Sequence, residues 1–227
     1  LGKVVNHVKV GPSPKWLSNY LHAYGIKSIN NVVDISNFVM VETGQPLHYY
    51  DLSKLPHHEI TVVDDVEMTM QALDGQDYEI KKGDLLITTG GEPTGIAGIM
   101  GGEESKIDES TTSIFIEAAG FNAVSIRNTS RRLGLSTEAA MHFTKGVEPM
   151  APIKAVDRSV QLLKELAEAD GFEENVLVGT IEDPVKTVSE TLTHCNTLLG
   201  TEFTMDQVLG VLKDLDLNPV QDGDCFT

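Results

Sequence analysis

The stretch NNVVDISNFVMVETGQPLH, residues 30–48, sets the interpretation of the whole chain. Its apolar residues favour a helix over about 31–42, and Gly44 supplies the stop, because glycine readily takes the left-handed conformation that ends helices. Gly44 and Pro46 then predict a turn that presents His48 on a loop, where an imidazole can form hydrogen bonds or transfer protons. For a lone histidine, an ordinary surface position is the more common interpretation.

Further helices and short strands are expected on both sides of this stretch. Upstream, the sequence predicts a strand over 4–10 and a helix with Ser13 as N-cap, Pro14 as first helical residue and Gly25 as its end. Downstream, the pattern favours strands at 59–63, 85–88 and 113–116, and helices over 122–133 and 150–169. The predicted fold class is α+β, with mixed sheets and packed helices.

A second unit is expected to begin near residue 183. Residues 185–193 alternate as a strand does, and Thr204-x-x-Gln207 is a capping-box start for a helix through 217. We therefore expect one domain over 1–183 and a truncated small α/β unit over 184–227. The missing initiator methionine and the end just after the turn signal Asp222-Gly223 suggest a piece of a longer polypeptide.

Charge is the strongest feature of the composition. The 34 Asp and Glu against 17 Lys and Arg give a net charge of −17 and a pI of about 4.6, which argues against broad contact with nucleic acid. The charge is banded, however: residues 1–60 carry +1 and 121–160 carry +3, whereas 61–120 carry −10 and 161–227 carry −11. Two of the four bands are therefore not acidic.

Membrane and disulfide classes are disfavoured. No apolar run reaches the roughly 18 residues that a membrane helix needs. The two cysteines, Cys195 and Cys225, form no C-x-x-C pair, so neither a zinc site nor a disulfide scaffold is expected, and a reducing cytoplasm is favoured.

Three features could carry chemistry. The glycine run over 95–102 could bring backbone N–H groups close to a ligand, although a tight turn between strands is the stronger interpretation. Glu117 ends an apolar strand, where a carboxylate is costly to bury without a partner; it is either a structural ion-pair member or a ligand-reading group. Arg127, Arg131 and Arg132 form a basic cluster, in which Arg127 and Arg131, four apart on a helix face, suit a phosphate or an acidic neighbour, although a solvated helix face is more common.

Together these segments resemble the β subunit of bacterial phenylalanyl-tRNA synthetase. The stretches that carry the resemblance are SPKWL (13–17), NNVVDISN (30–37), GQPLH (44–48) with Asp51, LDG (73–75), AGIMGGE (97–103), FIE (115–117), SIR (125–127) and SRRLGLSTEA (130–139). Their order and spacing run through about residue 150. The tail, with Leu198-Leu-Gly200 and 204–215, looks like the start of the following domain of that subunit.

The resemblance implies an editing domain that hydrolyses tyrosine wrongly esterified to phenylalanine tRNA. Such a domain forms part of a cytoplasmic phenylalanine–tRNA ligase, an α2β2 enzyme whose α subunit makes the aminoacyl adenylate with ATP and Mg²⁺. The resemblance implies no cofactor or metal in this chain itself, no membrane, and the 3′ end of aminoacylated tRNA(Phe) as partner. Editing is needed because an apolar synthetic pocket rejects an added hydroxyl only weakly.

Carried over by position, the resemblance also implies a site. Glu117 and the backbone of Gly101 would recognise the phenol group of tyrosine, while Gly98 and Ala139 would leave room for its ring. A water would attack the positioned ester without a covalent enzyme intermediate. The catalytic set would be Glu117 with the three residues that line the side of the ester and the terminal ribose, namely Asn37, His48 and Thr137.

One departure from the family affects this interpretation. Lys27, expected to contact the terminal nucleotide, stands where the family commonly has arginine, and lysine lacks the planar fork that binds phosphate in two places. An alternative is therefore a non-catalytic scaffold that docks tRNA or subunits after its editing activity has decayed.

Overall fold

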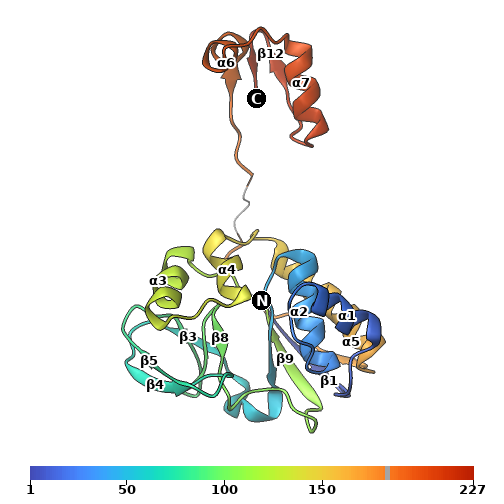
Figure 1. Ribbon diagram of the computed structural model, residues 1–227, viewed down its shortest axis with the longest axis vertical. Coiled ribbons are helices and arrows are strands. Elements are labelled where there is room, and N and C mark those ends of the chain that lie inside the picture. The colour runs from blue at the N-terminus through green and yellow to red at the C-terminus, as the bar shows by residue number, and fades with distance from the viewer. Residues whose placement is uncertain (182–184) are drawn as a thin grey trace. The chain divides into compact units, whose positions relative to one another are not determined.

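The computed structural model describes residues 1–181 and 185–227, which form two compact units, Leu1–Asp183 and Pro184–Thr227. The boundary predicted near 183 falls on residues 182–184, outside the described residues. Each unit is therefore described by itself (Figure 1).

A four-stranded antiparallel sheet forms one half of the larger unit. Its strands lie in the order β10-β1-β9-β2 and span Gly171–Phe172, Gly2–Asn6, Ser113–Glu117 and His48–Asp51. Figure 1 shows three helices grouped beside this sheet: α1 (Lys15–Ala23), α2 (Asn31–Thr43) and α5 (Ala151–Leu166). Since side chains alternate along a strand, Tyr49, Ile114 and Ile116 pack with these helices, whereas Tyr50 and Phe115 point to the opposite face.

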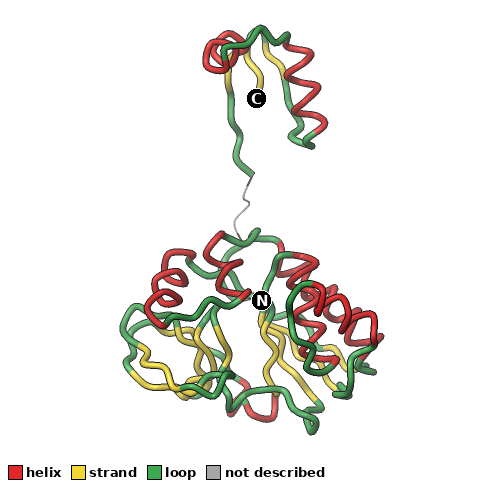
Figure 2. Tube along the Cα trace, in the orientation of Figure 1, coloured by secondary structure: helices red, strands yellow, loops and turns green. Residues whose placement is uncertain are grey.

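A second antiparallel sheet forms the other half. Its order is β3-β6-β7-β8, spanning Thr61–Val63, Leu86–Thr89, Glu92–Ile96 and Met100–Gly101. The hairpin of β4 (Met68–Gln71) and β5 (Asp77–Ile80) and the helices α3 (Ala123–Leu133) and α4 (Glu138–Lys145) lie beside it (Figure 2). Leu86 and Ile96 pack with Ile126 and Phe143 of these helices. Ile87 and Ala97 pack instead with Tyr50, which joins the two halves of the unit.

The predicted fold class, α+β, is confirmed. The helix expected over 31–42 is α2, and Gly44 follows it with a left-handed φ of 77°. Asn122 caps α3 through its side chain and Gly134 ends it, as predicted. The first strand, however, spans Gly2–Asn6 rather than 4–10, because its partner β9 fixes the register from Gly2 opposite Glu117 to Asn6 opposite Ser113.

The N-cap predicted for Ser13 is wrong. Pro14 occupies that position in α1, and the hydroxyl of Ser13 donates instead to Asp34 Oδ2 at 2.6 Å. Asp34 is fully buried and also accepts bonds from Ser28 and from the backbone N–H of Ile29. A buried carboxylate requires such donors, so the long-range bond prevails over the local capping signal.

The smaller unit is a three-stranded sheet with two helices. Its strands, in the order β11-β13-β12, span Glu190–Thr191, Cys225–Phe226 and Gln221–Asp222. The helices are α6 (Leu192–Leu199) and α7 (Met205–Asp214), and Thr204 and Gln207 form the predicted capping box. The strand predicted over 185–193 is wrong apart from its short β11 segment, because the side chain of Thr191 accepts from the His194 N–H and begins α6.

Two short 3₁₀ helices complete the larger unit, η1 (Leu52–Lys54) and η2 (Pro56–His58). They follow β2 directly and lead the chain from the first sheet to the second. The side chain of Asp51 begins η1 by accepting from the backbone N–H of Ser53.

Candidate functional site

A cavity of about 500 Å³ opens within the larger unit. Its walls come from β2 and β9 of the first sheet, the turn between β7 and β8, and the helices α2 and α4. Its surface is largely apolar, with side chains such as Val33, Met40, Ile99 and Phe143. Seven of the eight residues predicted for the site line it, namely Asn37, His48, Gly98, Gly101, Glu117, Thr137 and Ala139.

His48 lies on a strand and not on the predicted loop. It is the first residue of β2 and pairs with Glu117 across the sheet, so both side chains face the cavity. The sequence could not show this, because the strand has four residues and its partner is distant. Burial lowers the pKa of His48 to about 4, which keeps the imidazole neutral. Its Nε2 is buried and has no hydrogen-bond partner among the described residues, and is therefore available to a ligand or a water.

Gly101 lies directly against this imidazole. A Cβ placed on it would meet His48 Cε1 at 2.3 Å and Nε2 at 2.7 Å. Any residue other than glycine at position 101 would therefore force the imidazole ring to move. The predicted tight turn is present, since β7 pairs with β8 through Gly95 and Gly101. The glycine at 101 thus permits the close approach between the hairpin and His48.

Glu117 ends β9, and its carboxylate lies in the cavity wall. The hydroxyl of Tyr50 donates to Glu117 Oε2 at 2.6 Å, and the rings of Tyr50 and His48 meet edge to face at 4.3 Å. Burial raises the pKa of Glu117, while the bond from Tyr50 and the positive amino group of Leu1 oppose that rise. Burial and the neighbouring carboxylate raise the pKa of Tyr50, so Tyr50 remains the donor.

Gly98 and Thr137 have structural partners as well as places in the cavity wall. A Cβ on Gly98, whose φ is +64°, would meet the rings of Phe121 and Phe143 at 2.9 Å, so aromatic side chains fill part of the room beside it. The hydroxyl of Thr137 donates to the carbonyl of Ile99 at 2.8 Å and accepts from the Ala140 N–H at 3.1 Å. Thr137 therefore caps α4 and ties it to the glycine turn.

Asn37 and Ala139 remain open to the cavity. Asn37 faces it from α2 and makes no side-chain hydrogen bond within the described chain. Ala139 lies on the first turn of α4 beside Thr137, and its methyl group takes little room.

Lys27 is not brought to this cavity. It lies exposed on the connection between α1 and α2 and lines a separate shallow depression with residues of α1, including Ser18, Asn19 and His22. Among the described residues, the lysine or arginine that does line the cavity is Lys106, which pairs with Glu103. Lys106 and Tyr50 were not predicted as site residues. If β2 had been predicted as a strand, the alternation of its side chains would have placed Tyr50 on the same face as His48.

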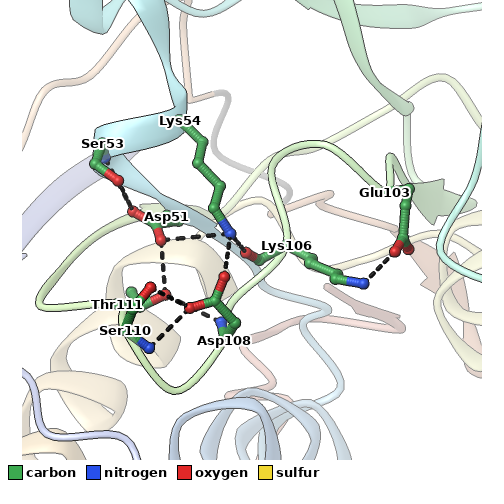
Figure 3. A network of polar contacts seen from close by, with 8 residues as sticks. All are labelled: Asp51, Ser53, Lys54, Glu103, Lys106, Asp108, Ser110 and Thr111. Atoms are coloured by element: carbon green, nitrogen blue, oxygen red, sulfur yellow. Dashed lines mark hydrogen bonds and ion pairs between the residues drawn. The ribbon is translucent and has the colours of Figure 1, made fainter.

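A polar network holds the segment 106–111, which includes Lys106, against β2 and η1 (Figure 3). The buried carboxylate of Asp51 accepts from Ser53 Oγ and Thr111 Oγ1, both at 2.7 Å. Lys54 lies 3.6 Å from Asp51 and donates to Asp108 at 2.5 Å and to the carbonyl of Lys106 at 2.8 Å. These bonds fix the segment at Lys106 through its carbonyl and at Thr111 through its hydroxyl.

The arginine cluster has mainly structural contacts. Arg132 pairs with the buried carboxylate of Asp84, and Arg127 donates to the Thr144 carbonyl at 2.9 Å. Among the described residues, no three His, Cys, Asp or Glu side chains are placed to hold a metal ion. None of the helices in the described ranges is long and apolar enough to cross a membrane.

The fold and the cavity define an α+β domain with a largely apolar pocket, whose polar groups include the Glu117 carboxylate and the neutral imidazole of His48. A family model described as the B3/4 domain matches residues 1–168. The chain belongs to the B3/4 domain family.

Curated relatives extend the match over nearly the whole chain. The "Phenylalanine--tRNA ligase beta subunit" of Streptococcus thermophilus is 38% identical over 226 residues, and that of Oceanobacillus iheyensis is 39% identical over 227 residues. These matches cover 99% and 98% of this chain, which spans 28% of the length of each relative. The resemblance to the phenylalanyl-tRNA synthetase β subunit, in its B3/4 region, is confirmed. A solved N-terminal fragment of that subunit from Pyrococcus horikoshii aligns with a TM-score of 0.47 and 11% identity, over 100% of this chain and 62% of that one.

Proposed function

We propose that the larger unit is an editing site that hydrolyses the ester of tyrosine wrongly attached to tRNA(Phe). The observation that carries the proposal is the placement of Glu117 in the wall of an apolar cavity of about 500 Å³, with one carboxylate oxygen held by Tyr50 and the other without a partner among the described residues. An apolar cavity of this size suits an aromatic side chain. The unpartnered oxygen suits a phenol at its end.

Such a site would separate tyrosine from phenylalanine by a hydrogen bond. Tyrosine would donate its phenol to Glu117, whereas phenylalanine would leave the carboxylate desolvated and unpaired, which is costly. A site built around a hydrogen bond to a substrate hydroxyl rejects the analogue that lacks it far better than an apolar pocket rejects an added hydroxyl. Discrimination in favour of tyrosine is the property that editing needs.

Hydrolysis would use a water held beside the ester. The water oxygen would bond to the carbonyl carbon, and the bond from that carbon to the ribose oxygen would break, releasing tyrosine and intact tRNA. His48 is suited to orient the ester or the water, because its buried Nε2 has no protein partner in the described chain. Asn37 faces the same space, and a ribose hydroxyl of the tRNA could take up or deliver the proton.

The partners proposed for the complete protein are those of its relatives. We expect a β subunit paired with an α subunit in a cytoplasmic α2β2 synthetase, where ATP and Mg²⁺ would serve aminoacyl-adenylate formation outside this domain. Lys106 would face the phosphates of the terminal nucleotides, since it is the cation that lines the cavity.

The test measures deacylation of tyrosyl-tRNA(Phe) by the complete synthetase carrying wild-type, Glu117→Ala or Glu104→Ala β subunits. Glu104 is exposed and makes no side-chain bond among the described residues, so its variant controls for the loss of a negative charge. We expect Glu117→Ala to lose most of the hydrolysis and Glu104→Ala to retain it. Background hydrolysis by wild type would refute the editing proposal and favour the docking scaffold.

Lys27→Arg tests the departure from the family pattern separately. If the terminal nucleotide reaches Lys27, the guanidinium should raise deacylation, because arginine can bind a phosphate in two places. Unchanged rates would agree with the position of Lys27 outside the cavity.

A further inference from the structure

The bond between Tyr50 and Glu117 suggests a role for a residue that the proposed mechanism leaves unused. Tyr50 has no exposed surface, and its hydroxyl lies 2.6 Å from Glu117 Oε2. Tyr50 and Glu117 come from neighbouring strands, and the paired positions His48–Glu117 and Tyr50–Phe115 place all four side chains on one face of the sheet. The donor is therefore fixed by the sheet and needs no movement to reach the carboxylate.

We propose that Tyr50 is a positioning and specificity-determining residue that holds Glu117 as an oriented acceptor for the phenol of the misattached tyrosine. This inference rests on the proposed editing function. In effect, the side chain of Tyr50 makes permanently, to one oxygen of Glu117, the kind of bond that the substrate tyrosine would make to the other.

The hydrogen bond from Tyr50 to Glu117 has two effects on how Glu117 would bind the substrate. First, a carboxylate with one oxygen bound cannot rotate freely, so Oε1 keeps a fixed direction toward the cavity. Second, the bond favours the ionised carboxylate, because a hydroxyl donates to it. An ionised acceptor left unpaired by phenylalanine costs more than a neutral acid would, so Tyr50 increases the discrimination between the two amino acids.

The other groups around Glu117 do not replace Tyr50. His48 lies opposite Glu117, but its lowered pKa keeps its imidazole neutral, and the amino group of Leu1 acts on Glu117 through its charge without a hydrogen bond to it. The charged side chains elsewhere in the cavity wall are Glu103, Lys106 and Glu138, and none of them bonds to Glu117 within the described chain. Tyr50 is thus the side chain that fixes the direction of the carboxylate.

Tyr49 provides a matched control from the same strand. Its hydroxyl bonds to Ser159 of α5, on the face of the sheet that packs against the helices. Tyr49→Phe therefore removes a buried tyrosine hydrogen bond as Tyr50→Phe does, but the lost bond, to Ser159, lies on the helix-packed face of the sheet and not beside Glu117. Any effect that comes only from lost stability should be common to both variants.

The experiment uses the complete synthetase with wild-type, Tyr50→Phe and Tyr49→Phe β subunits. Deacylation of tyrosyl-tRNA(Phe) and phenylalanyl-tRNA(Phe) is measured across pH. For Tyr50→Phe we expect kcat/KM on the tyrosyl ester to fall about tenfold or more, which is the usual effect of losing one hydrogen bond to a charged group. The preference for the tyrosyl ester over the phenylalanyl ester should fall with it. The acid limb of the tyrosyl profile should move to higher pH, because Glu117 loses a bond that lowers its pKa.

Tyr49→Phe should keep both the preference and the acid limb of wild type. Unchanged selectivity and an unchanged acid limb in Tyr50→Phe would overturn the inference. Faster tyrosyl hydrolysis would also overturn it, since Tyr50 would then compete with the substrate for Glu117. Equal losses in both tyrosine variants would assign the effect to stability and overturn it as well. If the wild-type enzyme hydrolyses neither ester, the proposed editing function is refuted. If wild type is active but Tyr50→Phe behaves as wild type, only the inference about Tyr50 is refuted.

Discussion

Replacing Gly101 by alanine should displace His48 while leaving the fold in place. The added Cβ would lie 2.3 Å from His48 Cε1 and 3.1 Å from Leu73 Cδ1, whereas ordinary contact begins at 3.4 Å. The imidazole must therefore shift by roughly 1 Å in a closely packed wall. The backbone of Gly101 lies outside the left-handed region, so alanine adds no conformational strain of that kind.

The size of the effect follows from this overlap. Overpacking of this kind costs about 1–3 kcal/mol of unfolding free energy, which a domain of this size can tolerate. A displacement of about 1 Å in a positioning group lowers an enzymatic rate on the order of 100-fold. The expected signature is thus a large loss of tyrosyl-tRNA(Phe) deacylation with a modest loss of stability.

The assay pairs deacylation by the complete synthetase with urea unfolding of the same variants. Gly120→Ala is the control, because nothing lies within 4 Å of a Cβ at that position, and it should match wild type in both measurements. Full deacylation activity in Gly101→Ala, with unchanged unfolding, would show that the hairpin does not press on His48 and would refute the reasoning.

Three further predictions concern stability. Burial lowers the pKa of His48 to about 4, so the contribution of His48 to the free energy of unfolding should be fully present above pH 6.5 and should decline by up to about 3 kcal/mol as the pH falls toward 4. The difference in unfolding free energy between wild type and His48→Gln, measured in urea, should show this pH dependence. A difference that does not change with pH would contradict the prediction. Arg132→Ala should cost about 1–3 kcal/mol because it leaves the carboxylate of Asp84 buried, whereas Arg131→Ala, which loses no side-chain bond in the described chain, should stay within about 0.5 kcal/mol; equal effects would contradict the pairing. Asp51→Ala should cost about 2–4 kcal/mol by removing the centre of the network in Figure 3, and Asp108→Ala, at a more exposed position, should cost less in the same unfolding assay.

Local signals in the sequence predicted several of the helices, although α6, at Leu192–Leu199, was not among them. The N-cap at Asn122, the stop at Gly134 and the capping box of Thr204 and Gln207 all occur where expected. Each of these features is decided within about four residues, so the chain around it carries the whole signal. The helix α4 was missed although Thr137 caps it, and its ends at Thr137 and Gly146 could have indicated it.

The pairing of strands was the main feature of the fold that the sequence did not predict. The strand β2 has only four residues, and its polar residues hide the alternation that would predict a strand. Its partner β9 lies far along the sequence, with Tyr50 and Glu117 separated by 67 positions. Because no local pattern encodes such pairing, the turn before His48 predicted a loop.

The sequence by itself determined the family, the α+β class and the membership of the cavity wall for seven of the eight predicted site residues. Their order and spacing carry that information even when the contacts are unknown. Only the tertiary structure decided that Lys27 lies outside the cavity, that Gly101 presses on His48 and that Tyr50 holds Glu117. The reason is physical: whether a polar group is desolvated, and which donor then satisfies it, depends on strands brought together from distant parts of the chain.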